Sequence, residues 1–111
     1  MMPLSVVIPT LNESRSLPLL LADLGRWPWP MQLLVVDGGS TDATATVAHL
    51  AGAEVLRSGE RGRGQQLLLG STNAREDWLL VLHADSRLHP HWPVAVSTVI
   101  NNPCNSSQAW T

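Results

Sequence analysis

The sequence predicts an α/β protein with a doubly wound parallel sheet, because unbroken apolar segments alternate with segments of helical periodicity. Residues 33–36 and 78–82 are continuous apolar runs, which is typical of parallel strands covered on both faces by helices. No hairpin signal separates any two strands. Because βα crossovers are right-handed, few topologies remain, and the expected strand order, numbered along the chain, is 3-2-1-4.

The stretch 33–42 is the centre of this prediction. Its apolar run stops at Asp37, which is followed by Gly38 and Gly39. The two glycines allow a sharp turn and a close approach of the backbone to a ligand. Residues 40–42, Ser-Thr-Asp, are expected to cap the helix that follows. In an open α/β sheet this position, at the carboxyl end of a strand, is where ligands bind.

The remaining elements follow from apolar spacing and from glycine and proline positions. The four expected strands are residues 4–8, 33–36, 54–56 and 78–82. The expected helices carry apolar or small residues at helical spacing at 17–24, 44–51, 67–74 and 92–100. Pro9 and Gly25 are expected to end the first strand and the first helix, and Gly52 to follow the second helix. The strand at 54–56 is short and expected at an edge of the sheet.

Length and charge limit the function further. With 111 residues the chain can form one domain, residues 1–111. A net charge of −2 argues against a nucleic-acid binder, which normally shows a basic face. The single cysteine, Cys104, fits a reducing compartment. No stretch reaches the length of a membrane span or matches a signal peptide, so we expect a soluble, cytoplasmic protein.

A second carboxylate, Asp85, follows the strand at 78–82 in the sequence His-Ala-Asp. Asp85 can hold a divalent cation against a diphosphate, and Asp37 can accept hydrogen bonds from a base or ribose. Arg61 and Arg63 can neutralise diphosphate charge. A dinucleotide fingerprint is absent, because the loop after the first strand contains no glycine. The residues therefore favour a nucleotide site built from carboxylates, a metal and arginines.

Three motifs resemble those of family 2 glycosyltransferases of the GT-A fold. They are Pro9-x-x-Asn12-Glu13, Val35-Val36-Asp37-Gly38-Gly39-Ser40-Thr41-Asp42 and Leu82-His83-Ala84-Asp85. The resemblance covers the Rossmann-like, nucleotide-binding half of a GT-A domain. Leu-His-Ala-Asp and the Arg-Gly-Arg of residues 61–63 are similar to a bacterial subgroup of arsenosugar- or selenosugar-related glycosyltransferases.

The resemblance implies that Thr10, Glu13 and Asp37 hold the nucleoside and that Asp85 binds Mg²⁺ or Mn²⁺. The full candidate donor-binding set is Thr10, Asn12, Glu13, Asp37, Gly38, Gly39, Arg61, Arg63 and His83. His83 stands where the family has the first aspartate of its Asp-x-Asp signature. Imidazole at this position can donate to a hydroxyl or ligate the metal. A zinc site formed with the nearby histidines is disfavoured, because their spacing matches no structural zinc pattern.

The expected function is inverting transfer of a sugar from a nucleoside-diphosphate sugar, a UDP-sugar by family default. The family's catalytic base comes from the acceptor-binding half, and no carboxylate follows Asp85, so no catalytic residue is assigned. We therefore expect a truncated chain, inactive alone, that self-associates through the edge of the strand at 78–82. Two alternatives remain open: a non-catalytic nucleotide-binding module and a nucleotidyltransferase.

Overall fold

The computed structural model describes residues 4–59 and 62–101 and contains one four-stranded parallel sheet. Its strands are β1 (Leu4–Thr10), β2 (Met31–Asp37), β3 (Glu54–Arg57) and β4 (Trp78–Val81). The helices are α1 (Leu17–Leu24), α2 (Thr44–Leu50), α3 (Arg63–Asn73) and α4 (Trp92–Asn101). The strand order is β3-β2-β1-β4, which confirms the predicted 3-2-1-4, with β3 at an edge.

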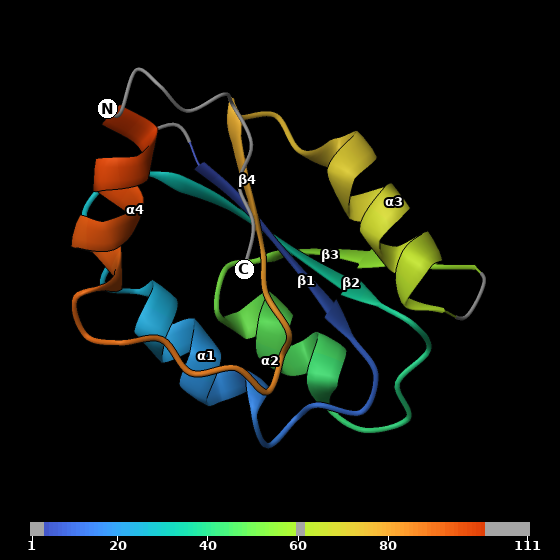
Figure 1. The fold of residues 1–111 in the computed structure, drawn as a ribbon. Helices are drawn as coiled ribbons and strands as arrows, with labels where there is room; N and C mark the ends of the chain where they lie inside the picture. Colours follow the sequence, from blue (N-terminus) through green and yellow to red (C-terminus); the bar gives the residue numbers. More distant parts are fainter. Residues whose placement is uncertain (1–3, 60–61, 102–111) are drawn as a thin grey trace.

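Helices cover both faces of the sheet (Figure 1). On one face, the apolar residues of α1, α2 and α4 pack with Leu4, Val6 and Ile8 of β1 in the larger core cluster. On the other face, α3 packs over a smaller cluster that contains Val7 of β1. The central strands are buried on both sides, which is why β1 and much of β2 are apolar without alternation.

β1 runs two residues beyond its predicted end at Ile8, through Pro9 to Thr10. Pro9 is opposite Val36 of β2. The backbone of Val7, two residues earlier, accepts a hydrogen bond from Leu82 on the β4 side, and residues two apart point the same way. The missing N–H of Pro9 therefore faces the side where β4 has ended, and the proline costs no ladder hydrogen bond.

α3 approaches the sheet closely at Gly70. A Cβ atom on Gly70 would lie 2.4 Å from Val7 Cγ1 and 3.2 Å from Val36 Cγ2. The helix itself starts earlier than predicted, because Arg63 already belongs to its first turn. Gly52 has φ +88 directly after the C-cap of α2, as predicted.

The predicted capping of α2 is right only for Asp42, whose Oδ1 accepts a hydrogen bond at 3.0 Å from the N–H of Thr44, the first residue of the helix. The predicted capping by Ser40 and Thr41 is wrong. The N-cap residue is Ala43, and it makes no side-chain cap hydrogen bond. Ser40 and Thr41 instead bond to Asn12 in the loop after β1. These hydroxyls and amides thus join two loops rather than serve the helix.

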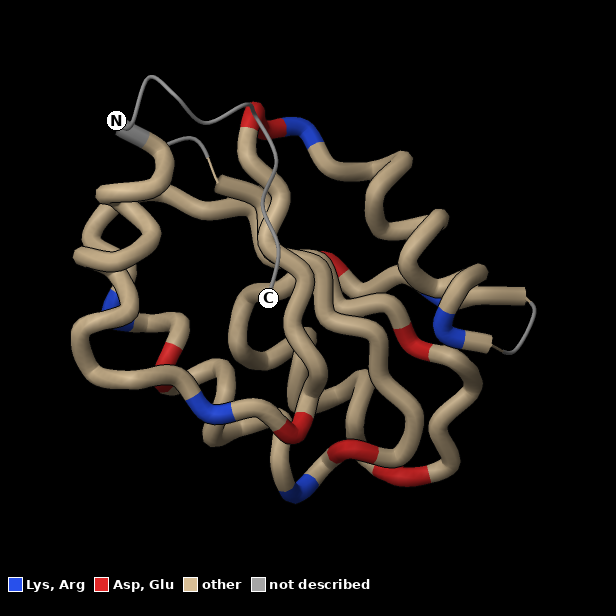
Figure 2. The backbone as a smooth tube through the Cα atoms, viewed as in Figure 1, with Lys and Arg blue, Asp and Glu red and all other residues tan. Residues whose placement is uncertain are grey.

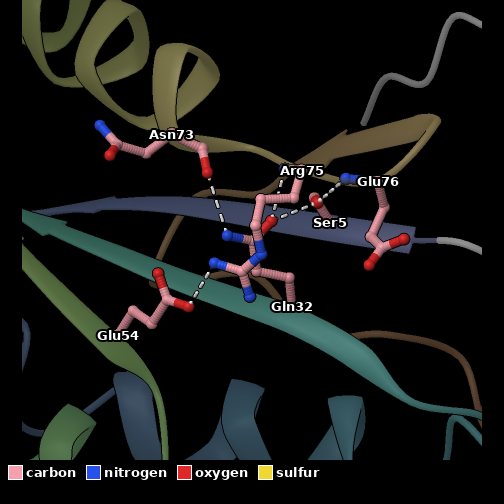
Figure 3. Close-up of polar contacts among 6 residues, drawn as sticks. All are labelled: Ser5, Gln32, Glu54, Asn73, Arg75 and Glu76. Atoms are coloured by element: carbon pink, nitrogen blue, oxygen red, sulfur yellow. Dashed lines mark hydrogen bonds and ion pairs between the residues drawn. The ribbon is translucent and has the colours of Figure 1, made fainter.

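A buried polar cluster lies at the amino end of the sheet (Figure 3). Gln32 Oε1 accepts hydrogen bonds from Ser5 Oγ and from the backbone N–H of Arg75, both at 2.7 Å. Gln32 Nε2 donates to the carbonyl of Asn73, and the N–H of Glu76 donates to Ser5 Oγ. This cluster fixes the connection between α3 and β4, far from the carboxyl ends of the strands.

No helix in the described part of the chain is both long enough and apolar enough to cross a bilayer.

Candidate functional site

Thr10 and Asp37 end the two central strands, side by side in register. Thr10 Oγ1 donates to Asp37 Oδ1 at 3.0 Å. The Asp37 carboxylate also accepts from the N–H groups of Gly39 and Ser40, at 3.2 and 2.9 Å, and from Ser40 Oγ at 2.5 Å. A carboxylate can accept about four hydrogen bonds. The four donors from Thr10, Gly39 and Ser40 therefore use the acceptor positions of Asp37.

These hydrogen bonds also set the charge state of Asp37, whose side chain is buried. Burial alone would raise its pKa, but the hydrogen bonds from Ser40, Thr10 and Gly39 together outweigh burial and lower the pKa below its usual value. Asp37 is therefore a carboxylate at neutral pH. A buried, fixed negative charge lies at the base of the site.

The loops after β1 and β2 are joined by hydrogen bonds along their length. Asn12 N–H donates to Ser40 Oγ at 2.8 Å, and Asn12 Oδ1 accepts from the N–H of Thr41 at 2.8 Å. One residue on, the N–H of Glu13 donates to Thr44 Oγ1 at 2.9 Å. Asn12 has φ +54, a left-handed conformation that asparagine tolerates better than most residues. The two loops therefore present one rigid rim.

Two residues that the sequence analysis did not assign to the site help to build it. Gln66, buried in α3, donates from Nε2 to the carbonyls of Thr10 and Val36 at 2.9 and 2.8 Å. Its amide also lies closer than van der Waals contact to where a Cβ of Gly38 would stand, with Nε2 at 3.1 Å, so a side chain at Gly38 would displace the amide. Asp42 accepts from the N–H of Ser14 and of Thr44. Gln66 belongs to none of the quoted motifs, and a glutamine near the start of a helix carries no sequence signal for this role.

Arg63 is the first residue of α3 and is exposed. Residues three apart share a helix face, so Arg63 lies one turn before Gln66, beside the ends of β1 and β2. Gly39 is exposed with φ +102, where a side chain would be strained, and Gly38 is buried. The predicted participation of Arg61 falls outside the described residues.

The second carboxylate reaches the same end of the sheet from β4. β4 is the neighbour of β1, with Val7 opposite Val81, so the chain that leaves β4 passes beside the end of β1. Leu82 and Ala84 are buried, while His83 and Asp85 between and after them are exposed. Within the described part of the chain, the side chains of His83 and Asp85 make no hydrogen bond or ion pair, so their polar atoms are available to a ligand.

This donor set fits a divalent cation that is completed by a ligand. Among residues 4–59 and 62–101, no group of three or more acidic, histidine or cysteine side chains forms a closed metal cage. Hard cations such as Mg²⁺ are commonly held by one or two carboxylates together with phosphate oxygens and water, and an exposed, unpaired carboxylate such as Asp85 suits that arrangement. Figure 2 shows acidic positions along the lower edge of the view, in the loops that follow β1 and β2 in Figure 1 and in the turn beside them.

Comparison with known sequences gives a family. Residues 5–108 match the model of Glycosyl transferase family 2. An uncharacterized glycosyltransferase of Mycobacterium tuberculosis is 40% identical over 84 residues, which cover 76% of this chain and 37% of that protein. The chain thus spans little more than a third of the length of this relative.

Comparison with solved structures supports the fold. TarS of Staphylococcus aureus in complex with UDP superposes with a TM-score of 0.81 and 22% identity, over 90% of this chain and 32% of that one. A mannosyltransferase from Pyrobaculum calidifontis, in complex with GDP-Man and Mn²⁺, has a TM-score of 0.81 and 20% identity, over 93% of this chain and 34% of that one. At these identities the likeness concerns the fold alone, and it is that of GT-A glycosyltransferases.

Proposed function

Since the chain belongs to glycosyl transferase family 2, we propose that residues 1–111 form the donor-binding part of a glycosyltransferase that uses a nucleoside-diphosphate sugar. One observation carries this proposal. β2 and β4 each deliver a carboxylate, Asp37 and Asp85, to the same end of a parallel sheet, on either side of the loop after β1. That crevice is the ligand position of open α/β sheets.

In this proposal the nucleoside lies against the rim formed by Thr10, Asn12 and Glu13, over Asp37 and the glycine turn. The turn is already rigid, because hydrogen bonds join its two loops, so ordering it adds little to the free-energy cost of binding. Gly39 leaves the backbone open to a close ligand, with nothing within 4 Å of a Cβ position.

The diphosphate lies between Arg63 and the turn after β4 in this arrangement. The Arg63 guanidinium can donate two parallel hydrogen bonds to phosphate oxygens. Asp85 is the proposed ligand of Mg²⁺ or Mn²⁺. His83 is proposed to donate a hydrogen bond to a hydroxyl of the ligand or to bind the same metal. A cation bound there supplies charge stabilisation of the leaving nucleoside diphosphate. A UDP-sugar remains the first choice of donor by family default, and UDP is bound in the TarS structure.

Two finer assignments belong to the same proposal. Transfer with inversion is expected, and the anomeric configuration of a product, read by NMR, tests it. Membership in the arsenosugar- or selenosugar-related subgroup rests on residues 82–85 and on the Arg-Gly-Arg of residues 61–63. Transfer to acceptors of that class by a protein that contains this chain would support it, and transfer only to unrelated acceptors would contradict it.

Self-association through β4 is a further part of the proposal. β4 lies at one end of the described sheet, and an edge strand presents backbone groups that can pair with another chain. Light scattering over a concentration series should show species larger than a monomer. A monodisperse monomer at every concentration would contradict pairing through β4.

Calorimetry with UDP tests the proposed function directly. The chain should bind UDP more tightly with Mn²⁺ than without it, and Asp85→Ala should remove that difference. Asp77→Ala is the matched control, because Asp77 is an exposed acid just before β4, at the opposite end of the strand. No binding of UDP or GDP by the wild-type chain, or an equal loss in both variants, would contradict the proposal.

A further inference from the structure

Asp23 of α1 holds the segment that follows the proposed metal-binding turn. Its carboxylate accepts from Arg87 Nε at 2.8 Å, from Arg87 Nη2 at 3.1 Å and from the N–H of Leu88 at 2.9 Å. Its backbone carbonyl accepts from the Trp92 indole at 2.7 Å. One residue thus makes four hydrogen bonds to residues 87–92.

The two partners of this ion pair differ in burial. The Asp23 side chain is 9% exposed and the Arg87 side chain 60% exposed, so the carboxylate is fixed in the protein while the arginine reaches it from the loop. Trp92 is fixed as well, since it stacks on Trp27 with ring centroids 5.2 Å apart and planes at 15°. Two-point binding of a planar guanidinium to a carboxylate sets orientation as well as distance.

The other end of the same segment is anchored to β1. The N–H of Leu82 donates to the carbonyl of Val7 at 3.0 Å, and the N–H of Ser86 donates to the carbonyl of His83 at 3.0 Å. Asp85 therefore lies in a turn that is held three residues before it, at Leu82, and two to three residues after it, by Asp23. Asp85 itself contributes nothing to this fixation, because its side chain is unpaired among the described residues.

We propose that Asp23 and Arg87 are positioning residues that hold the Asp85 carboxylate where a divalent cation and a diphosphate can meet it. This inference rests on the proposed donor-binding function. Neither residue touches the ligand in this arrangement. Their effect is to restrict the turn to one conformation, so that the cation meets a fixed oxygen.

A contact that only stabilises the fold would give a different result. Its loss would lower the free energy of unfolding and weaken the binding of every ligand alike. A positioning role concerns only the part of the ligand at the turn. The ratio of UDP affinities with and without Mn²⁺ measures binding at the turn. The affinity for uridine, which has no phosphate, measures binding at the rest of the site.

The test uses Arg87→Met and Asp23→Asn in the full chain, with calorimetry against UDP, with and without Mn²⁺, and against uridine. Arg87→Met keeps the Leu88 hydrogen bond and removes an exposed group, so it is the variant expected to fold most like the wild type. The control is Arg75→Met, which removes a similarly exposed arginine from an ion pair of 2.9 Å to Glu54 at the amino end of the sheet (Figure 3).

We expect the Mn²⁺-dependent gain in UDP affinity to fall by about tenfold or more in both variants, a loss typical of residues that orient a metal ligand. Uridine affinity should be retained, and Arg75→Met should behave as the wild type. If Mn²⁺ raises the UDP affinity of Arg87→Met and Asp23→Asn as much as that of the wild type, the positioning role is overturned and the proposed function stays intact. An equal loss in Arg75→Met would also overturn it. A wild-type chain whose UDP binding ignores Mn²⁺ would overturn the proposed metal site and this inference together.

Discussion

The side-chain amide of Gln66, in the second turn of α3, donates a hydrogen bond of 2.9 Å to the backbone carbonyl of Thr10, at the end of β1. The same nitrogen donates to the carbonyl of Val36 at 2.8 Å. A helix on one face of the sheet thus fixes the two strand ends that carry the candidate site. The position of the site depends on α3 as well as on the motifs.

Gln66→Leu should therefore lower the free energy of unfolding by about 1 to 3 kcal/mol, because two carbonyls lose a buried donor. Chemical denaturation measures this change. Gln65→Leu is the control, since Gln65 is exposed, and its effect should stay within about 0.5 kcal/mol. Equal effects of the two substitutions would show that the Gln66 amide does not hold the strand ends.

The close approach of α3 leads to a second prediction. Gly70→Ala should destabilise the protein by about 1 to 3 kcal/mol, because the new Cβ would overlap Val7. Gly64→Ala, in the first turn of the same helix, meets nothing within 4 Å and should be neutral or stabilising by up to about 1 kcal/mol. The melting temperatures of the two variants, compared with that of the wild type, test this prediction. A stabilising Gly70→Ala would mean that α3 lies farther from the sheet.

Some features of the fold and of the candidate site were predictable from local sequence patterns. Unbroken apolar runs predicted the strands and their order, because buried parallel strands need no alternation. Asp85 was found because it follows such a run, and the structure places it at the expected end of the sheet. Its role as a metal ligand stays a prediction. The end of β1 was missed, because the proline rule ignores which side of the strand its missing N–H faces.

Other features depend on contacts that are distant in sequence. Gln66 reaches Thr10 across 56 positions, and Arg87 reaches Asp23 across 64. Neither pair has a local pattern. The same holds for Ser40, which local rules assign to a helix cap but which bonds to Asn12, 28 positions earlier. Local periodicity predicted the elements, whereas these partners are set by packing of the whole sheet.

Asp37→Asn should separate the nucleoside from the diphosphate. The substitution places a donor where the carboxylate now accepts from N–H and hydroxyl groups, so the free energy of unfolding should fall by about 1 to 3 kcal/mol. The distorted turn should also weaken uridine binding, while the binding of inorganic pyrophosphate with Mn²⁺ should change little. Titration of both ligands checks this. Equal losses for uridine and pyrophosphate would place Asp37 near the metal instead.

Acid should weaken the contact between Asp23 and Arg87. The hydrogen bonds from Arg87 and from the N–H of Leu88 lower the pKa of Asp23 to about 2, against about 3.9 in an unfolded chain. The unfolded state therefore binds more protons between these values, and stability falls as pH drops from about 4 towards 2. Asp23→Asn has no carboxylate at this position, so its stability lacks this pH-dependent contribution. Its melting temperature should lie below that of the wild type at pH 7, and the gap should narrow towards pH 2. A gap that stays constant would contradict the assignment.

The most direct measurement of the central claim is paramagnetic broadening by Mn²⁺ in ¹H–¹⁵N spectra of the chain with UDP bound. Small amounts of Mn²⁺ should first broaden the backbone signals of Asp85, Ser86 and Gly39, at the carboxyl end of the sheet. The signals of Gln32 and Arg75, in the polar cluster at the amino end (Figure 3), should stay sharp. Broadening centred on the amino end or on His89 and His91, or broadening that does not depend on UDP, would contradict a metal–diphosphate site at Asp85.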